Sequence, residues 1–311
     1  MACRPVARSG TDHQTNLPHM NLIAVIGDIH HQLGLAAEGL RRIEQEFGRP
    51  IAQVFSVGDF GLFLDEPDWN YLTGPKKYRK PEDSPKIRAA WKSWRWPLSA
   101  IAGNHEPFHR LRDWDASYFS FKLDYTNAGE LAHKIPGLRV AGLSGIYHPQ
   151  EMEFVTALEA QTMKLPRVEA WPQMVSLAEE NKISRSRLTY FKEFEVEYLK
   201  SLNFTPDLLL LHDWPVTPPH IGQSYPRRPE AEIVEALQPP FVCCGHHHTA
   251  GDFTIGPTRV LPLNIISTKE LIHRHIINPG WCALFELEGT QLRVLQTWPE
   301  SSPSQTLTLA R

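Results

Sequence analysis

The chain has 311 residues, of which 41% are hydrophobic and 22% are charged, a composition typical of a globular protein with one large domain and insertions. A formal net charge of -3 and a pI near 6.6 exclude a general attraction to nucleic acid or membranes, so any polyanion would have to bind a local basic patch. No stretch reaches the roughly 18 apolar residues of a membrane span, and four cysteines without metal-finger spacing indicate reduced, buried thiols and a cytoplasmic location.

The first predicted elements alternate strand and helix. Residues 21–26 form a strand that ends on the turn Gly-Asp-Ile-His at 27–30, and residues 34–47 carry apolar side chains at helical spacing. Residues 51–57 form the next strand, which ends on Gly-Asp-Phe-Gly at 58–61. Because glycine permits a sharp turn, the second carboxylate is expected to face the same pocket as the first.

An insertion over residues 62–97 interrupts this alternation with five prolines. Between residues 76 and 96, eight basic residues against two acidic ones give a local net charge of +6, and aromatic residues lie among them. Such a segment can contact phosphates and stack on bases, or it can be a solvated insertion whose tryptophans cover the core. The candidate substrate contacts are Lys76, Lys77, Arg79, Lys80, Trp91 and Trp94.

The rest of the chain returns to short strands that end on polar residues. Residues 98–102 lead into Gly-Asn-His-Glu at 103–106, residues 208–211 end on His212, and residues 241–244 lead into Gly-His-His-His at 245–248. A hairpin over 131–143, a helix over 184–202, a helix over 230–237 and closing strands over 253–263, 282–287 and 292–298 complete the prediction. Alternating strands and helices followed by consecutive strands indicate an α/β sandwich with mixed sheets.

The predicted domain organisation is simple. Residues 1–20 are expected to be a disordered tail, residues 21–298 one domain and residues 299–311 a second tail. The domain carries insertions at about 62–97 and 147–182.

Five strand-end segments each supply oxygen or nitrogen donors, and ligands of α/β sheets bind at the carboxyl ends of strands. Seven donors exceed the needs of one ion, so two divalent cations about 3.5 to 4 Å apart are expected, with Asp59 as the bridging carboxylate. Imidazole, carboxylate and amide donors without thiolate suit Mn²⁺, Fe or Zn²⁺, of which Mn²⁺ is favoured for activity. The predicted metal ligands are Asp28, His30, Asp59, Asn104, His212, His246 and His248.

A pair of cations of this kind suits in-line displacement at phosphorus by an activated water. His105 stands beside the predicted ligand Asn104 and is the candidate general acid for the leaving oxygen, with Glu106 orienting its imidazole. His247, between two predicted ligands, is expected to point away from them and to support the site.

The ordered set Asp-x-His, Gly-Asp, Gly-Asn-His-Glu, His and Gly-His-x-His resembles the calcineurin-like metallophosphoesterase superfamily over residues 22–265. The resemblance implies a four-layer αββα sandwich with the metal site at the strand carboxyl ends, and it places His105 at the general-acid position. It also implies that Asp28, His30, Asp59 and His248 hold one metal, and that Asp59, Asn104, His212 and His246 hold the other.

A narrower resemblance, to RNA lariat debranching enzymes, rests on Gly-Leu-Ser-Gly-Ile at 142–146 and His-Asp-Trp-Pro at 212–215 together with the earlier motifs. Those enzymes hydrolyse a 2′,5′-phosphodiester in branched RNA. They usually carry cysteine where this chain has Asp28, and residues 147–182 do not keep their substrate-loop pattern. The resemblance therefore favours a phosphodiesterase that acts on a nucleotide or nucleic-acid ester, RNA included, over debranching itself.

Two alternative activities and one non-enzymatic reading stay open. Protein phosphatases share Gly-Asn-His-Glu, but their second motif continues into Asp-Arg-Gly, where residues 60–63 here read Phe-Gly-Leu-Phe. A phosphomonoesterase would use the same ligand set. A non-catalytic metal-bearing scaffold is disfavoured because His105 accompanies all seven ligands. In every case the expected partner is a phosphate ester, and neither a membrane nor a protein partner is implied.

Overall fold

The computed structural model describes residues 21–73, 76–111, 123–126, 128–149, 167–217 and 228–300. The predicted tail 1–20, residues 301–311 of the second tail and residues 150–166 of the second insertion lie outside the described residues. Within the described part of the chain, no helix is both long and apolar enough to cross a bilayer.

The first sheet has the strand order β12-β11-β1-β2-β3-β4. Its four strands β1 to β4 are parallel to one another, whereas β11 runs antiparallel to β1 and β12 runs antiparallel to β11. The bounds are β1 Asn21–Ile26, β2 Ile51–Ser56, β3 Leu98–Ala100, β4 Leu123–Tyr125, β11 Cys282–Glu288 and β12 Gln291–Trp298.

The second sheet has the strand order β5-β6-β7-β8-β10-β9. Strands β6, β7, β8 and β10 are parallel, and β5 and β9 are antiparallel to the strands beside them. The bounds are β5 Ala128–Glu130, β6 Val140–Leu143, β7 Leu208–Leu211, β8 Phe241–Cys244, β9 Phe253–Ile255 and β10 Thr258–Pro262.

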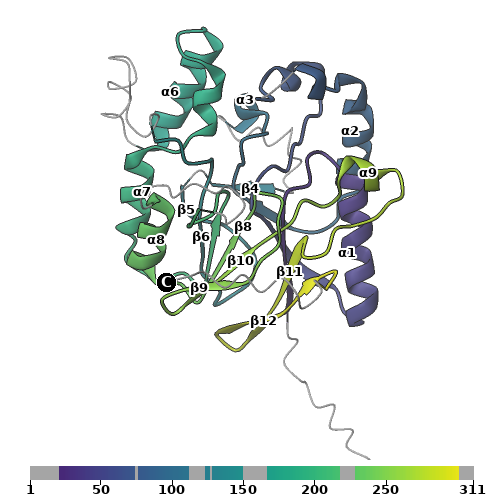
Figure 1. Cartoon of the computed structure of the whole chain (residues 1–311), viewed down its shortest axis with the longest axis vertical. Helices are drawn as coiled ribbons and strands as arrows, with labels where there is room; N and C mark the ends of the chain where they lie inside the picture. Colours follow the sequence, from purple (N-terminus) through teal and green to yellow (C-terminus); the bar gives the residue numbers. More distant parts are fainter. Residues whose placement is uncertain are drawn as a thin grey trace, which may run out of the picture.

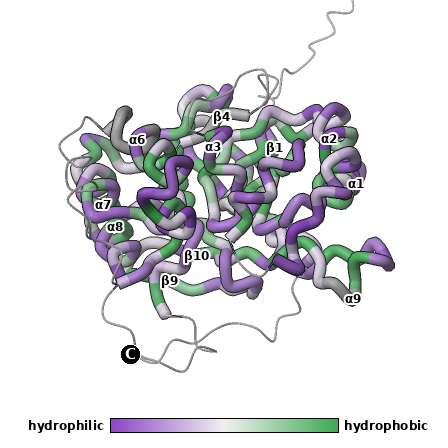
Figure 2. The backbone as a smooth tube through the Cα atoms, turned by 90° about the horizontal axis from the view of Figure 1, so that it is seen from above, coloured by the Kyte–Doolittle hydropathy of each residue, from purple (hydrophilic) through white to green (hydrophobic). Residues whose placement is uncertain are grey.

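Helices cover the outer faces of the two sheets. Seen from above, α1 and α2 lie at one side of the molecule and α7 and α8 at the other, with β1 and β10 between them (Figure 2). The described part of the chain also contains α3, α6 and α9, and α2, α3 and α6 lie at the same end of the molecule (Figure 1). The bounds are α1 Leu33–Phe47, α2 Ser84–Ser93, α3 Phe108–Leu111, α6 Arg167–Glu179, α7 Glu193–Lys200, α8 Pro229–Leu237 and α9 Lys269–Ile272.

Side-chain alternation along the strands divides the core into layers. In β1, Leu22, Ala24 and Ile26 pack in the cluster that contains the buried face of α1, whereas Ile23 and Val25 pack in the cluster between the sheets. In β8, Cys243 joins the inter-sheet cluster and Cys244 joins the cluster with α7 and α8, because adjacent strand residues point to opposite faces. The layers follow the order helix, sheet, sheet, helix, which confirms the predicted four-layer αββα sandwich with two mixed sheets.

Three local predictions were wrong. The predicted strand 253–263 is the hairpin of β9 and β10, which turns at Gly256 with φ +55°. The predicted helix 184–202 is a 3₁₀ turn, Arg185–Thr189, followed by α7, because Tyr190 is extended and pairs with Ile146. In the predicted hairpin 131–143, the strand that pairs with β6 is β5, three residues earlier than expected.

Candidate metal centre

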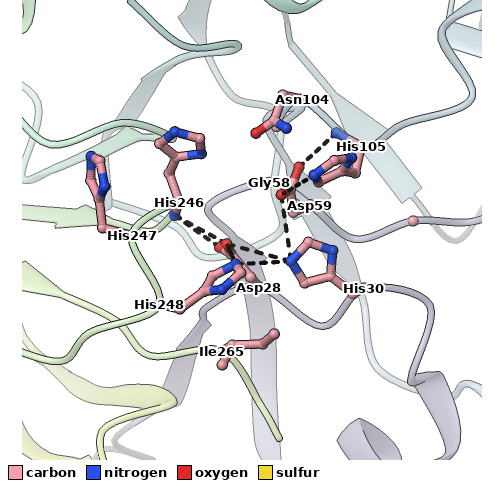
Figure 3. Close-up of polar contacts among 12 residues, drawn as sticks. Asp28, His30, Gly58, Asp59, Asn104, His105, His246, His247, His248 and Ile265 are labelled. Carbon is pink, nitrogen blue, oxygen red and sulfur yellow. Dashed lines mark hydrogen bonds and ion pairs between the residues drawn. The ribbon is translucent and has the colours of Figure 1, made fainter. Parts of the chain in front are cut away.

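The predicted donor residues meet where the two sheets bring the carboxyl ends of their parallel strands together. Loops after β1, β2 and β3 come from the first sheet, and loops after β7 and β8 come from the second. Figure 3 shows the side chains of Asp28, His30, Asp59 and His248 turned toward one another, with Asn104 and His105 on the next loop. Parallel strands of one sheet share an edge, so five separate sequence segments reach one place.

One tight group consists of Asp28, His30, Asp59 and His248, each of which offers a ligand atom within 4.8 Å of the others. His248 Nε2 lies 3.2 Å from Asp28 Oδ2 and 3.0 Å from His30 Nε2. His30 Nε2 lies 3.6 Å from Asp59 Oδ2. Two imidazoles and two carboxylates at these separations can surround a divalent cation, so the geometry fits the first predicted ligand set.

A second convergence involves His212, which is completely buried. Its Nδ1 lies 2.8 Å from the carbonyl oxygen of Val57, so this nitrogen carries the proton. Its Nε2 then presents a lone pair in the neutral ring, and it faces Asn104 Oδ1 at 3.2 Å and Asp59 Oδ1 at 3.5 Å. Three acceptor atoms that face one another require a proton or a cation between them, and this fits a second divalent ion.

His246 and His247 differ in their surroundings. The ring of His246 lies 5.2 Å from the ring of His212 between centroids, but it also belongs to a group with Asp213 and His247. His247 Nε2 lies 3.0 Å from Asp213 Oδ1, on the side away from Asp28. The side chain of His247 therefore contacts a carboxylate outside the group of predicted ligands.

Burial and charge prepare these groups to bind cations. Burial lowers the pKa of both His30 and His246 to about 4, so both rings are neutral at pH 7, the form that binds metals. Burial alone would raise the pKa of Asp59, but the surrounding imidazoles, His105 first, hold it below its usual range. Burial is likewise outweighed at Asp28, where the hydrogen bond from His248 lowers the pKa. Both carboxylates are therefore ionised.

The loops hold several of these residues in left-handed backbone conformations. Positive φ angles occur at His30 (42°), Asp59 (48°), His246 (66°) and His248 (53°). Such conformations are uncommon for residues other than glycine and persist where the surrounding structure imposes them, often at functional sites. Four of the seven predicted ligands share this feature.

Two glycines let the loops approach closely. A Cβ atom on Gly245 would lie 2.2 Å from Asp28 Oδ1, and one on Gly103 would lie 2.1 Å from Asp59 Oδ1. Both distances are shorter than any van der Waals contact, so a larger residue at either position would displace a predicted metal ligand.

His105 and Glu106 occupy different environments. The backbone N–H of His105 donates to Asp59 Oδ1 at 2.7 Å, and its ring Nε2 lies 4.0 Å from Asp59 Oδ2. The expectation that Glu106 orients the ring of His105 was wrong. The Glu106 carboxylate instead accepts hydrogen bonds from the backbone N–H groups of Phe60 (2.8 Å), Gly61 (2.9 Å) and Gly103 (3.4 Å). It joins the Asp59 loop to the Asn104 loop.

Two features of the surroundings of Glu106 have opposite effects on its pKa. Burial and the neighbouring Asp59 carboxylate raise the pKa of Glu106 to about 8, whereas the backbone N–H groups favour its ionised form. The hydrogen bonds of this carboxylate are therefore with the backbones of the two loops.

The predicted substrate contacts of the first insertion divide into two kinds. Trp91 and Trp94 are only 2% and 1% exposed and pack with Phe60, so their prediction as base-stacking surfaces was wrong. Their burial matches the alternative in which the tryptophans of the insertion cover the core. Lys76, Lys77 and Lys80 are exposed, and Arg79 is half-buried. Of these six predicted contacts, the four basic residues can therefore meet a ligand, whereas the two tryptophans cannot.

The sequence analysis did not predict a buried network of ion pairs that contacts His247. Asp213 contacts His247 and Arg228, and Arg228 also binds Glu230, with Nη2 2.9 Å from Oε1. Asp213 could have been found because it directly follows His212. Arg228 had no comparable signal, since it lies 15 residues farther along the chain outside any motif.

A comparison with protein families matches the calcineurin-like phosphoesterase model to residues 22–250. This range contains all seven predicted metal ligands together with His105.

Several sequence relatives are lariat debranching enzymes. The lariat debranching enzyme of Caenorhabditis briggsae is 27% identical over 212 residues, which cover 65% of this chain and 38% of that protein. The lariat debranching enzyme of Arabidopsis thaliana is 25% identical over 73% of this chain and 54% of its own length. That of Entamoeba histolytica is 24% identical, over 80% and 70% respectively. The chain thus spans about half or less of the first two relatives.

Similarity to a solved structure supports the fold alone. One such structure has a TM-score of 0.52 and 13% sequence identity, and the alignment covers 89% of this chain and 99% of the other.

Proposed function

This chain belongs to the calcineurin-like phosphoesterase family, and on that premise we propose that it is a metal-dependent phosphodiesterase that hydrolyses a nucleotide or nucleic-acid ester. The observation that carries the proposal is the convergence of imidazole, carboxylate and amide donors from both sheets on Asp59, with His105 beside them. The debranching enzymes among its relatives support a nucleic-acid ester and make a 2′,5′-phosphodiester one candidate.

The proposed cofactor is a pair of divalent cations, with Mn²⁺ favoured. Bound cations would supply Lewis-acid polarisation of the phosphate and a water nucleophile that ionises near neutral pH. The proposed ligands of one ion are Asp28, His30, Asp59 and His248, and those of the other are Asp59, Asn104, His212 and His246.

The side chains of the protein have separate proposed tasks. His105 is part-exposed at the rim of the donor cluster, where its ring can donate a proton to the leaving oxygen of a bound ester. Asp59 holds the backbone of His105 through the 2.7 Å hydrogen bond, which fixes the general acid relative to the donors. Glu106 fixes the two loops to each other and does not take part in proton transfer.

The exposed basic residues Lys76, Lys77 and Lys80 are the proposed contacts for substrate phosphates outside the reacting ester. Three buried free cysteines, Cys243, Cys244 and Cys282, agree with the cytoplasmic location that the sequence suggests.

The test compares three substrates with the purified protein and added Mn²⁺: bis(p-nitrophenyl) phosphate, p-nitrophenyl phosphate and a 2′,5′-branched RNA. Faster hydrolysis of the diester than of the monoester supports the proposal, and cleavage of the branched RNA would narrow the substrate to a debranching type. Absence of diester hydrolysis with Mn²⁺, Fe²⁺ and Zn²⁺ alike would refute it.

The same panel separates the alternatives. Preference for the monoester would indicate a phosphomonoesterase, and rapid dephosphorylation of a phosphoserine peptide would indicate a protein phosphatase. Metal binding without any turnover would indicate a non-catalytic scaffold.

A further inference from the structure

A cavity of about 580 Å³ lies beside the donor cluster, between the first insertion and the segment after α6. Its volume is within the range of pockets that bind small ligands. Residues 70–73 and Arg79 line one side, and residues 181–186 line the other. Thr73 connects it to the centre, because its hydroxyl donates to the carbonyl oxygen of Asn104 at 2.8 Å. The cavity therefore begins next to a proposed metal ligand.

The lining is basic. Arg79, Lys182 and Arg185 are its charged residues, and none of its lining residues is acidic. Lys182 is paired with Glu180, with Nζ 2.5 Å from Oε2, so its charge is balanced at the exposed rim. Within the described part of the chain, no carboxylate lies within ion-pair distance of Arg79 or Arg185. Two guanidinium groups thus face one cavity with no ion-pair partner among the described residues.

Each guanidinium has donors to spare. Arg79 donates from Nη2 to the carbonyl oxygen of Leu72 at 3.5 Å, and Arg185 donates from Nη1 to that of Asn70 at 3.3 Å. The Nε atom of each is buried and has no acceptor among the described residues. A guanidinium carries five N–H donors, and the single acceptor described for each arginine leaves other Nη donors that a ligand in the cavity could use.

The second arginine is held in place. The guanidinium of Arg185 lies over the ring of Tyr71 at 4.9 Å, and Tyr71 stacks on His109 with centroids 4.4 Å apart. Hydroxyl groups add further donors, since Ser184 and Ser186 share one hydrogen bond of 2.8 Å and so leave one hydroxyl hydrogen unused. Fixed guanidinium forks with hydroxyl donors match the geometry of a phosphate group.

We propose that this cavity is a subsite for a second phosphate group of the substrate, bound by Arg79 and Arg185 and separate from the phosphodiester at the metal centre. The inference rests on the proposed function, because it takes the reacting ester to lie among the donors on the other side of Thr73. It narrows the substrate to esters that carry a further phosphate on one of the two esterified groups.

The test uses a dinucleotide without terminal phosphate and the same dinucleotide with a 5′- or 3′-phosphate. The wild-type protein should have a KM about tenfold lower for one phosphorylated form. Arg79→Ala and Arg185→Ala should each remove that preference by raising the KM for the phosphorylated form. Arg88→Ala is the matched control, because Arg88 is exposed on α2 and does not line the cavity; it should keep the preference.

A conservative variant and a binding measurement complete the test. Arg185→Lys keeps the positive charge and the packing on Tyr71, so the variant should fold. It loses the paired N–H donors of the guanidinium, so it should retain only part of the preference for the phosphorylated dinucleotide. Anisotropy with labelled phosphorothioate dinucleotides, which resist hydrolysis, measures the same preference as a ratio of Kd values without turnover. A preference in binding without diester turnover would refute the proposed function but keep the subsite. Equal binding of all forms, or a preference that both alanine variants retain, would overturn the subsite.

Discussion

The backbone N–H of His246 donates to both carboxylate oxygens of Asp28, at 3.3 Å and 3.1 Å. Asp28 follows β1 of the first sheet and His246 follows β8 of the second, 218 residues later in the chain. This contact joins the two sheets at the donor cluster and fixes one proposed ligand through the backbone of another.

Replacement of Gly245 tests the dependence of the centre on this close approach. In Gly245→Ala the new Cβ would lie 2.2 Å from Asp28 Oδ1, so we expect a loss of about 1 to 3 kcal/mol in the free energy of unfolding and weaker Mn²⁺ binding. Gly34→Ala is the control, since nothing lies within 4 Å of its Cβ position in α1, and it should gain about 0.5 to 1 kcal/mol. Urea denaturation and Mn²⁺ titration measure both. Unchanged metal affinity in Gly245→Ala would contradict the described approach of the loops.

Replacement of His105 separates proton transfer from metal binding. His105→Ala should lower turnover of an alkyl or nucleoside diester by about 10² while the bound metal content stays the same. The loss should be smaller for bis(p-nitrophenyl) phosphate, because p-nitrophenolate leaves without needing a proton. Steady-state kinetics with both ester types and metal analysis check the prediction. An equal loss with both leaving groups would remove the general-acid role.

The strand-end motifs allowed the sequence to predict much of the fold and of the centre. Asp28, Asp59 and His212 each follow an apolar run that becomes a strand, and parallel strands bring such ends together. The task of Glu106 could not be predicted, because its partners are backbone N–H groups of a loop about 45 residues earlier, which no side-chain pattern encodes. Trp91 and Trp94 were wrongly predicted to contact substrate because basic residues surround them in the sequence. Their burial depends on tertiary packing, which the sequence pattern does not show.

Charge reversal tests the exposed basic segment. Lys76→Glu/Lys77→Glu should weaken binding of single-stranded RNA by about tenfold at low salt and reduce the slope of log Kd against log salt concentration. Lys134→Glu/Arg41→Glu makes the same change in net charge at exposed positions outside the segment and should have a much smaller effect. Anisotropy titrations at several salt concentrations measure both. Equal effects of the two variants would assign the loss to net charge alone.

Acid stability tests an ion-pair network far from the centre. Burial would raise the pKa of Glu286, but hydrogen bonds from Arg293 (2.6 Å) and Arg49 (2.5 Å) lower it below its ordinary value of 4.5. A depressed folded-state pKa stabilises the protein above pH 4.5, and that contribution is lost as the pH falls through the folded-state value. Glu286→Gln should therefore cost about 1 kcal/mol at pH 7, a figure reduced by solvent screening of the arginines.

The difference in the free energy of unfolding between the wild type and Glu286→Gln should depend on pH. Denaturant unfolding of wild type and Glu286→Gln at several pH values below 4.5 should show the two stabilities converging as the pH falls. A difference that stays constant from pH 7 down to pH 3 would mean that the carboxylate charge contributes nothing.

We propose that Asp59 and the donors around it hold divalent cations, and that these cations make the protein a phosphodiesterase. The most direct measurement is hydrolysis of bis(p-nitrophenyl) phosphate by chelator-treated protein as Mn²⁺ is added in known equivalents, for wild type and Asp59→Asn. We predict no turnover without metal, a rise that levels off near two equivalents in the wild type, and at least a 10²-fold loss in Asp59→Asn. Asp252→Asn, at an exposed carboxylate paired with Arg259, should behave as the wild type does. Full turnover by the chelated protein, or wild-type turnover in Asp59→Asn, would contradict the claim.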